Sequence, residues 1–211
     1  MIFEHLTVGA FQCNCFILGC AKTRQAIVID PGDNPDAILR RVADQGLTVT
    51  AIVATHAHLD HVGGMVGVHT ATGAPTSLHR ADQFLYDNLA VQAAAFGLPT
   101  PPSGPVTRYV ADGDVVAWGQ QELQVIHTPG HTPGSLCFYL PGEKILFSGD
   151  TLFAGGVGRT DLWGGSHPQL LTSIRERLLT LPEATQVLPG HGGGTAIGHE
   201  AENNPFLVQR G

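Results

Sequence analysis

The segment from residue 55 to residue 64 constrains this chain more than any other part of it. It reads THAHLDHVGG, and within six residues it holds four side chains that can bind a metal: His56, His58, Asp60 and His61. Imidazole nitrogen and carboxylate oxygen are common ligands of divalent metal ions. Crowding so many titratable groups beside a predicted strand would be costly without a cation to balance them. The segment therefore predicts a metal site rather than a solvated histidine-rich loop.

The spacing within this segment indicates more than one metal. In an extended loop, His56, His58 and Asp60 would alternate on one side, whereas His61 lies off that alternation. One short loop is then able to serve two adjacent metal ions. The remaining ligands are expected from the ends of other strands.

Three further ligand candidates stand among glycines beside predicted strands. They are His131 in HTPGHTPGS, Asp150 in LFSGDTLF and His191 in LPGHGGG. Glycine has no side chain, so it lets the backbone approach a metal site closely. Each of the three taken alone is as easily a turn residue, but together with the first cluster they make a set of seven candidates.

Short apolar segments rich in Val, Ile and Phe predict strands in both halves of the chain. The first half holds residues 2–8, 13–19, 26–29 and 48–54, and the second holds 106–110, 115–118, 123–127, 135–140, 144–147 and 185–188. The five segments from 106 to 147 predict a second sheet. A helix is expected between Asn34 as its N-cap and Gly46 as its C-cap glycine. Further helices are expected near 62–71, over 81–96 and over 168–181, and a proline-rich extended loop at 98–105. The pattern favours an α+β fold, a four-layer αββα sandwich.

Length and composition limit the classes of protein and partner. The 211 residues predict a single domain, 1–211, and 43% hydrophobic content is ample for a core. The net charge is −7, with two lysines and no basic run, which argues against nucleic acid as a partner. No apolar window is long enough for a membrane helix, so no membrane partner is expected. A monomer or a small homo-oligomer fits this composition.

The cysteines and the first residues predict a cytoplasmic location. Cys13, Cys15, Cys20 and Cys137 form no CxxC pair, and three of them lie in an apolar run. Buried free thiols are the expected reading, which suits a reducing compartment. The first residues, MIFEHLTVGAFQ, lack the basic and continuous apolar regions of an export signal.

Four motifs in order, THAHLDH, PGHTPGS, GDTLF and PGHGGG, resemble the signature of metallo-β-lactamase-fold hydrolases. The resemblance is greatest to the compact bacterial glyoxalase II-like, or hydroxyacylglutathione hydrolase-like, proteins, and it extends from Thr55 to about Thr195. It implies the αββα sandwich and two divalent metal ions, zinc first, with iron or manganese as alternatives because the same ligands suit all three. It further implies a ligand set: His56, His58 and His131 for the first metal, Asp60, His61 and His191 for the second, and Asp150 bridging both.

The activity implied is hydrolysis of a small-molecule thioester, S-lactoylglutathione or a related S-acyl glutathione, by attack of metal-bound hydroxide. Asp60 is the expected catalytic residue, because its carboxylate can accept a hydrogen bond from the hydroxide and orient it. A thiolate leaving group needs little protonation, so no separate general acid is required. The alternatives are an iron-dependent persulfide dioxygenase, whose family shares the GRTD segment, a lactone or β-lactam hydrolase, and a metal-binding module without activity.

Three residues outside the ligand set are expected to support it. Arg159 either holds a substrate carboxylate or pairs with Asp161. Asp30, after AIVID, is expected to hydrogen-bond a ligand histidine, and His127 to have a structural role. The longer glyoxalase II enzymes bind glutathione through a basic C-terminal extension that has no counterpart here. Weak glutathione affinity is therefore expected, with Arg159 and the 98–105 loop at the mouth of the pocket.

Overall fold

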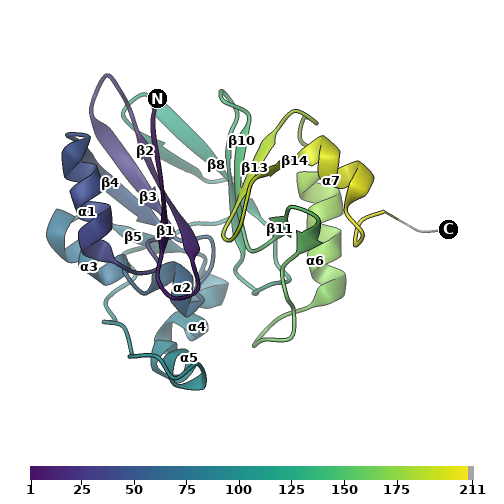
Figure 1. The fold of residues 1–211 in the computed structure, drawn as a ribbon, viewed down its shortest axis with the longest axis horizontal. Helices are drawn as coiled ribbons and strands as arrows, with labels where there is room; N and C mark the ends of the chain where they lie inside the picture. Colours follow the sequence, from purple (N-terminus) through teal and green to yellow (C-terminus); the bar gives the residue numbers. More distant parts are fainter. Residues whose placement is uncertain (209–211) are drawn as a thin grey trace.

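Two six-stranded mixed sheets face each other in the computed structural model, which describes residues 1–208 (Figure 1). In order across the first sheet the strands are β1 (Ile2–Val8), β2 (Cys13–Gly19), β3 (Gln25–Ile29), β4 (Thr48–Val53), β5 (Thr76–Leu78) and β6 (Arg108–Tyr109). Across the second they are β14 (Thr195–Ala196), β13 (Gln186–Pro189), β10 (Ile145–Gly149), β9 (Leu136–Leu140), β8 (Gln121–His127) and β7 (Val115–Trp118). A small hairpin of β11 (Leu152–Phe153) and β12 (Gly156–Val157) forms a separate two-stranded sheet.

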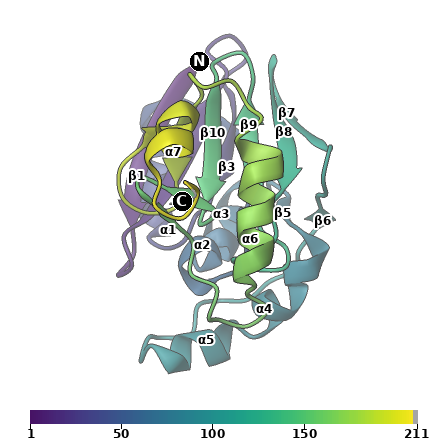
Figure 2. The same ribbon diagram turned by 90° about the vertical axis from the view of Figure 1, so that its right-hand side faces the viewer.

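Helices cover the outer face of each sheet (Figures 1 and 2). Beside or below the first sheet lie α1 (Pro35–Asp44), α2 (Leu59–Val62), α3 (Met65–Thr72), η1 (Arg80–Asp82), α4 (Gln83–Asp87) and α5 (Leu89–Ala95). The second sheet is covered by α6 (His167–Ser173), which continues as the π-helical turn η2 (Ile174–Leu178), and by α7 (Ile197–Asn203). Among residues 1–208 there is no helix with the length and apolar character needed to cross a membrane.

Alternating apolar side chains explain why the sheets stack. On β2, Ile17 packs in the cluster beneath α1 and α3, whereas Leu18 packs in the cluster between the sheets. On β9, Phe138 faces the first sheet and Tyr139 faces α6. Strands that are apolar on both faces need a partner on each side. The predicted αββα sandwich is therefore confirmed.

Several predicted elements differ in detail. The segment 106–110 was expected in the second sheet, but only its residues 108–109 are a strand, β6, which pairs with β5 in the first sheet. The short and partly polar β5 was not predicted at all. The helix expected over 81–96 is broken at Asn88. The side-chain amide of Asn88 donates from Nδ2 to the Phe84 carbonyl and competes with the helical hydrogen bonds. The predicted domain 1–211 includes three residues, 209–211, that lie outside the described part.

The helix at 35–44 forms without the cap that was expected. Asn34 adopts a left-handed conformation with φ 52°, and its side chain makes no capping hydrogen bond to α1. Its Oδ1 instead accepts the Gly9 amide at 3.0 Å, which ties the turn after β1 to the start of the helix. Gly46, with φ +57°, ends the helix as expected.

Replacing the buried Phe138 by alanine should destabilise the fold strongly. The ring is fully buried between the sheets, so truncation removes apolar contacts and leaves a cavity, at a cost of about 3–5 kcal/mol. Urea unfolding followed by circular dichroism measures the loss. Phe206→Ala is the matched control, because that ring is 46% exposed and its removal should cost less than about 0.5 kcal/mol. Equal losses in the two variants would contradict the two-sheet core.

Candidate metal centre

The loop that follows β4 carries four of the predicted ligands. His56 lies in a bend, and His58, whose backbone is extended, is the residue immediately before α2. The loop was expected to stay extended through Asp60, but it turns into a helix at Leu59, so Asp60 and His61 lie in the first turn of α2. The change of direction separates the four side chains into two pairs.

The first pair meets a histidine from the β8–β9 connection. His131 Nε2 lies 2.9 Å from His58 Nδ1 and 3.2 Å from His56 Nε2. Each of these three buried side chains offers one ring nitrogen, and the three nitrogens all lie within 4.8 Å of one another. They form one group that we call the first triad.

The second pair meets a histidine from the loop after β13. His191 Nε2 lies 3.2 Å from His61 Nε2 and 3.1 Å from Asp60 Oδ2. These three residues are the second triad. Asp150, which follows β10, stands between the triads, with Oδ1 at 3.4 Å from His61 Nε2 and Oδ2 at 3.7 Å from His131 Nε2. The structure thus brings all seven predicted side chains together, and His56 also lies near His61 and Asp150.

In three of the histidine rings, a hydrogen bond on the side away from the cluster sets which ring nitrogen faces the other predicted ligands. His131 Nδ1 donates to the Arg159 carbonyl at 2.7 Å, and His191 Nδ1 donates to the Phe11 carbonyl at 3.1 Å. His61 Nδ1 donates to Asp30 Oδ2 at 2.9 Å, so the expected contact of Asp30 with a ligand histidine is present. A neutral imidazole that donates from Nδ1 has its lone pair on Nε2. When neutral, all three rings therefore aim a lone pair inward.

This donor set fits divalent cations. Burial, with the neighbouring histidines, holds the pKa of His56 well below its usual value, and burial lowers the pKa of His58 to about 3. Both rings are neutral at physiological pH, as metal ligation requires. Asp150 Oδ1 is buried without a hydrogen-bond partner among the described residues, although burial makes such an atom costly. Facing lone pairs and an unpartnered carboxylate oxygen are the expected state of residues that hold metal ions.

The carboxylates keep their charge inside the site. Burial alone would raise the pKa values of Asp60 and Asp150, but His61 and the other nearby histidines outweigh it and lower both. The same carboxylates raise the pKa of His191, against the effect of burial. The second triad thus attracts positive charge, which protons supply when a metal ion does not.

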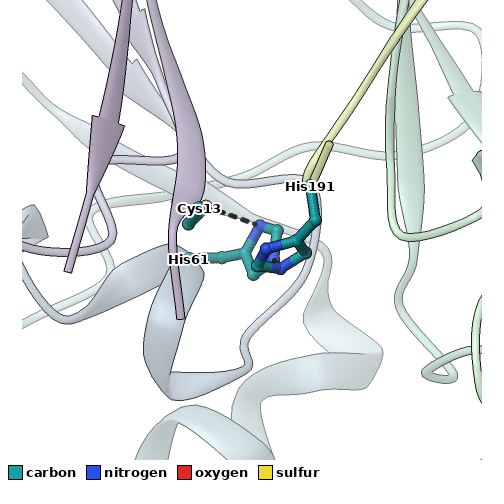
Figure 3. A group of neighbouring side chains, drawn as sticks. All are labelled: Cys13, His61 and His191. Atoms are coloured by element: carbon teal, nitrogen blue, oxygen red, sulfur yellow. Dashed lines mark hydrogen bonds between the residues drawn. The ribbon is translucent and has the colours of Figure 1, made fainter. Parts of the chain in front are cut away.

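Cys13, at the start of β2, lies beside this triad, as Figure 3 shows. Its Sγ is 3.6 Å from His61 Nδ1. Burial raises the pKa of this thiol to about 12, so it stays protonated and packs against the ring behind the site. All four cysteines are free and buried, as predicted, but nothing in the sequence signalled the contact, because 48 residues separate Cys13 from His61.

The glycine before His191 is required by close packing. A Cβ built at Gly190 would clash with Asp150 Oδ1 and would lie 2.6 Å from His61 Cε1. Any larger residue must therefore displace two of the predicted ligands. This bears out the expectation that glycine lets the backbone come close to the site.

One buried carboxylate that links the ligand loops was missed from the sequence. Asp82, in η1, accepts the amide of Ala57 at 3.0 Å, the amide of Gly134 at 2.6 Å and the hydroxyl of Thr132 at 2.8 Å. Ala57 lies between two ligands of the first triad, and Thr132 follows the third. Burial raises the pKa of Asp82, and these donors counter the shift. An isolated aspartate before an apolar helix carries no signal of such a role.

A cavity of about 410 Å³ opens in front of the two triads. His58, Asp60, His131, Asp150 and His191 form part of its lining, as does Arg159. The Arg159 guanidinium makes a bidentate ion pair with Asp161, at 2.7 and 2.8 Å, which is one of the two roles expected for it.

The proline-rich segment 98–102 lines a neighbouring groove of about 350 Å³, which shares Asp60 with the cavity. His127 donates to the Pro133 carbonyl at 2.9 Å and so supports the His131 loop.

Comparison with known proteins agrees with this geometry. A family model described as the metallo-beta-lactamase superfamily matches residues 8–191. The chain belongs to the metallo-beta-lactamase superfamily. The match confirms the resemblance that the four motifs indicated.

Full-length relatives of this superfamily are similar to the chain. Hydroxyacylglutathione hydrolase GloC of Haemophilus influenzae is 36% identical, over 98% of each chain. The solved structure of BLEG-1 B3 metallo-beta-lactamase is 37% identical with a TM-score of 0.92, covering 99% of this chain and 100% of that one. TTHA1623, solved in a di-iron-bound form, is 43% identical with a TM-score of 0.87, covering 97% and 100%.

Asp150→Ala should be the most damaging single change to metal binding. The substitution removes the side chain that faces both triads, and two cations would then repel each other without an anion between them. Elemental analysis of protein from metal-supplemented medium should give two ions per chain for the native protein and fewer for the variant. Asp161→Ala, at an exposed carboxylate paired with Arg159, is the control. A native stoichiometry of one, or full metal content in Asp150→Ala, would contradict the predicted ligand set.

Asp82→Asn should weaken metal binding although Asp82 faces neither triad directly. An amide offers one acceptor oxygen where the carboxylate offers two, so one backbone donor loses its partner and the ligand loops lose their fixed spacing. Supporting contacts of this kind are worth about 10–100-fold in metal affinity. Titration against a competing chelator measures the change. Asp87→Asn, at the exposed last residue of α4, is the control and should bind metal like the native protein.

Proposed function

We propose that the protein is a metal-dependent thioester hydrolase that acts on S-acyl glutathiones such as S-lactoylglutathione. The observation that carries the proposal is the placement of Asp150 between two triads at the floor of an open cavity. A donor set divided between two ions leaves coordination positions for water and substrate, unlike a closed structural site. Similarity to the hydroxyacylglutathione hydrolase GloC supports the choice of thioester.

The residues have separate roles in this proposal. His56, His58 and His131 would hold one divalent ion, Asp60, His61 and His191 a second, and Asp150 would touch both. Such ions, when bound, lower the pKa of a water molecule to about 7 and polarise a carbonyl group. Asp60 lines the cavity as a carboxylate, so it can accept a hydrogen bond from the attacking water and orient it.

The reaction balances without a further acid. A hydroxyl oxygen bonds to the thioester carbon, the carbon–sulfur bond breaks, and the electron pair leaves with sulfur. The products are a carboxylic acid, which loses its proton to solvent, and a thiolate. A thiol has a pKa near 8.5, so its anion is a good leaving group at neutral pH. The described cavity offers no lysine as a proton donor, and this chemistry needs none.

A β-lactam hydrolase is the second candidate. BLEG-1 B3 metallo-beta-lactamase is similar to the chain over nearly its whole length. A β-lactam also presents a carbonyl to an attacking water, so the same residues would serve. Its leaving group is an amine, which needs a proton more than a thiolate does. For that reason we place the thioester first.

Purified, metal-loaded protein should release thiol from S-lactoylglutathione under argon. Asp60→Asn should lose most of this activity, because the amide can neither bind a cation through its nitrogen nor carry the negative charge that orients water. Thiol release followed with a chromogenic disulfide measures both proteins. Asp87→Asn, at an exposed carboxylate outside the triads and outside the cavity lining, is the control.

Two parallel assays distinguish the alternatives. Oxygen consumption with glutathione persulfide, after loading with Fe(II), tests the dioxygenase, and a chromogenic β-lactam tests the lactamase. Rapid oxygen uptake with negligible anaerobic thiol release would replace the hydrolase by a dioxygenase. Hydrolysis of the β-lactam alone would move the proposal to the second candidate.

A further inference from the structure

The cavity in front of the triads has an apolar wall opposite its polar floor. Six of its lining residues are large and apolar: Phe11, Leu85, Val91, Phe96, Leu162 and Trp163. They come from the turn after β1, from α4 and α5, and from the loop before α6. The Phe11 and Phe96 rings form an edge-to-face pair with centroids 5.0 Å apart, which joins two sides of the wall.

Much of this wall is exposed. Phe96 is 50% exposed, Trp163 51% and Val91 48%, although apolar side chains of this size are usually buried. Four of the ten large apolar side chains that are exposed within residues 1–208 line this one cavity. Exposed apolar groups gathered at a concave site mark a place where a ligand is bound.

The side chains that line the cavity offer little to the carboxylates of a glutathione arm. Glutathione carries two carboxylates, and the one cationic side chain that lines the described cavity is Arg159. Its guanidinium is already engaged by Asp161 through two hydrogen bonds. Among the described lining residues, the two carboxylates of the arm therefore find no free cationic side chain to pair with. This arm is better placed toward solvent.

We propose that this cavity receives the acyl arm of the substrate and that the preferred acyl group is bulky and apolar, aromatic above all. The proposal rests on the thioester hydrolase function argued above. Phe11, Phe96 and Trp163 are the specificity-determining residues. Aromatic rings in the wall would pack edge to face or offset against an aromatic acyl group and gain more than its buried area alone.

Phe11 also connects this wall to the second triad. Its carbonyl accepts the Nδ1 proton of His191, while its ring lines the cavity. The group that contacts the acyl arm and the group that orients a predicted ligand thus belong to one residue. Alanine at position 11 keeps the carbonyl and removes only the ring, but a shift of this turn would disturb both. Phe96 and Trp163 are therefore the cleaner positions for a test.

The test compares S-mandeloylglutathione with S-lactoylglutathione, which share the thiol arm and the 2-hydroxyacyl carbon and differ by phenyl in place of methyl. We expect at least a tenfold higher kcat/KM for the mandeloyl thioester, mainly through KM, since a hydrophobic pocket discriminates by about tenfold or more for each added methylene. Phe96→Ala and Trp163→Ala should bring the ratio toward one, because the loss of kcat/KM should fall mainly on the mandeloyl thioester, whose phenyl group packs against these rings.

Two matched controls and one binding measurement complete the experiment. Phe206→Ala and Val115→Ala, both at exposed apolar side chains outside the cavity, should leave the ratio unchanged. Inhibition by S-benzylglutathione and S-methylglutathione, which are thioethers with no thioester bond to hydrolyse, separates binding from reactivity. The benzyl compound should inhibit at least tenfold more strongly, and Phe96→Ala should remove that difference.

The outcomes are distinct. Hydrolysis of both thioesters with equal kcat/KM, or a mandeloyl preference that survives both Phe96→Ala and Trp163→Ala, would overturn the assignment of the acyl arm and leave the thioester hydrolase standing. Failure to hydrolyse either thioester under argon would overturn the proposed function itself. A preference lost in the cavity variants and kept in the controls would establish the acyl pocket.

Discussion

Seven side chains with lone pairs or negative charge converge on one small volume at the edge of two sheets. The surrounding strands and loops hold these side chains in place. His61 is fully buried, and its Nε2 lies 3.2 Å from that of His191, with a lone pair on each when both rings are neutral. Such an arrangement costs free energy in the absence of positive charge. The ends of β4, β8, β10 and β13 all deliver ligands to this edge. The core between the sheets holds those strand ends in register.

The orientation of the rings depends on backbone as much as on side chains. The carbonyls of Arg159 and Phe11 each accept an imidazole proton. Side chains serve two other rings, with Asp30 on His61 Nδ1 and the Thr55 hydroxyl 3.1 Å from His56 Nδ1. Backbone acceptors are fixed by the fold and cannot be removed by substituting the residue. They hold the histidines in one tautomer and in one direction, which is what a ligand for a metal ion needs.

The same residues that orient ligands also shape the cavity. Arg159 supports His131 through its carbonyl and lines the cavity with its guanidinium, and Phe11 does the equivalent for His191 with its ring. Asp82 fastens the loop of the first triad to the loop that carries its third histidine. The cavity lining and the geometry of the predicted ligands are thus coupled through three short loops. A change in pocket shape is expected to alter the site behind it.

The sequence by itself determined the layered fold and the seven residues that meet at the site. Strand periodicity indicated two sheets apolar on both faces, and the density of histidine and aspartate in THAHLDH, with isolated partners among glycines, indicated where ligands would gather. Local patterns carry this information because side-chain alternation and backbone freedom are properties of neighbouring residues.

Only the tertiary structure decided the contacts between distant segments. It joined β6 to the first sheet, turned Asp60 and His61 into a helix, and set Cys13 against His61 across 48 residues. It also gave Asp82 its three donors and gathered Phe11, Phe96 and Trp163 around one cavity. None of these follows from local periodicity, since each depends on which surfaces of separate elements come to face one another when the two sheets pack.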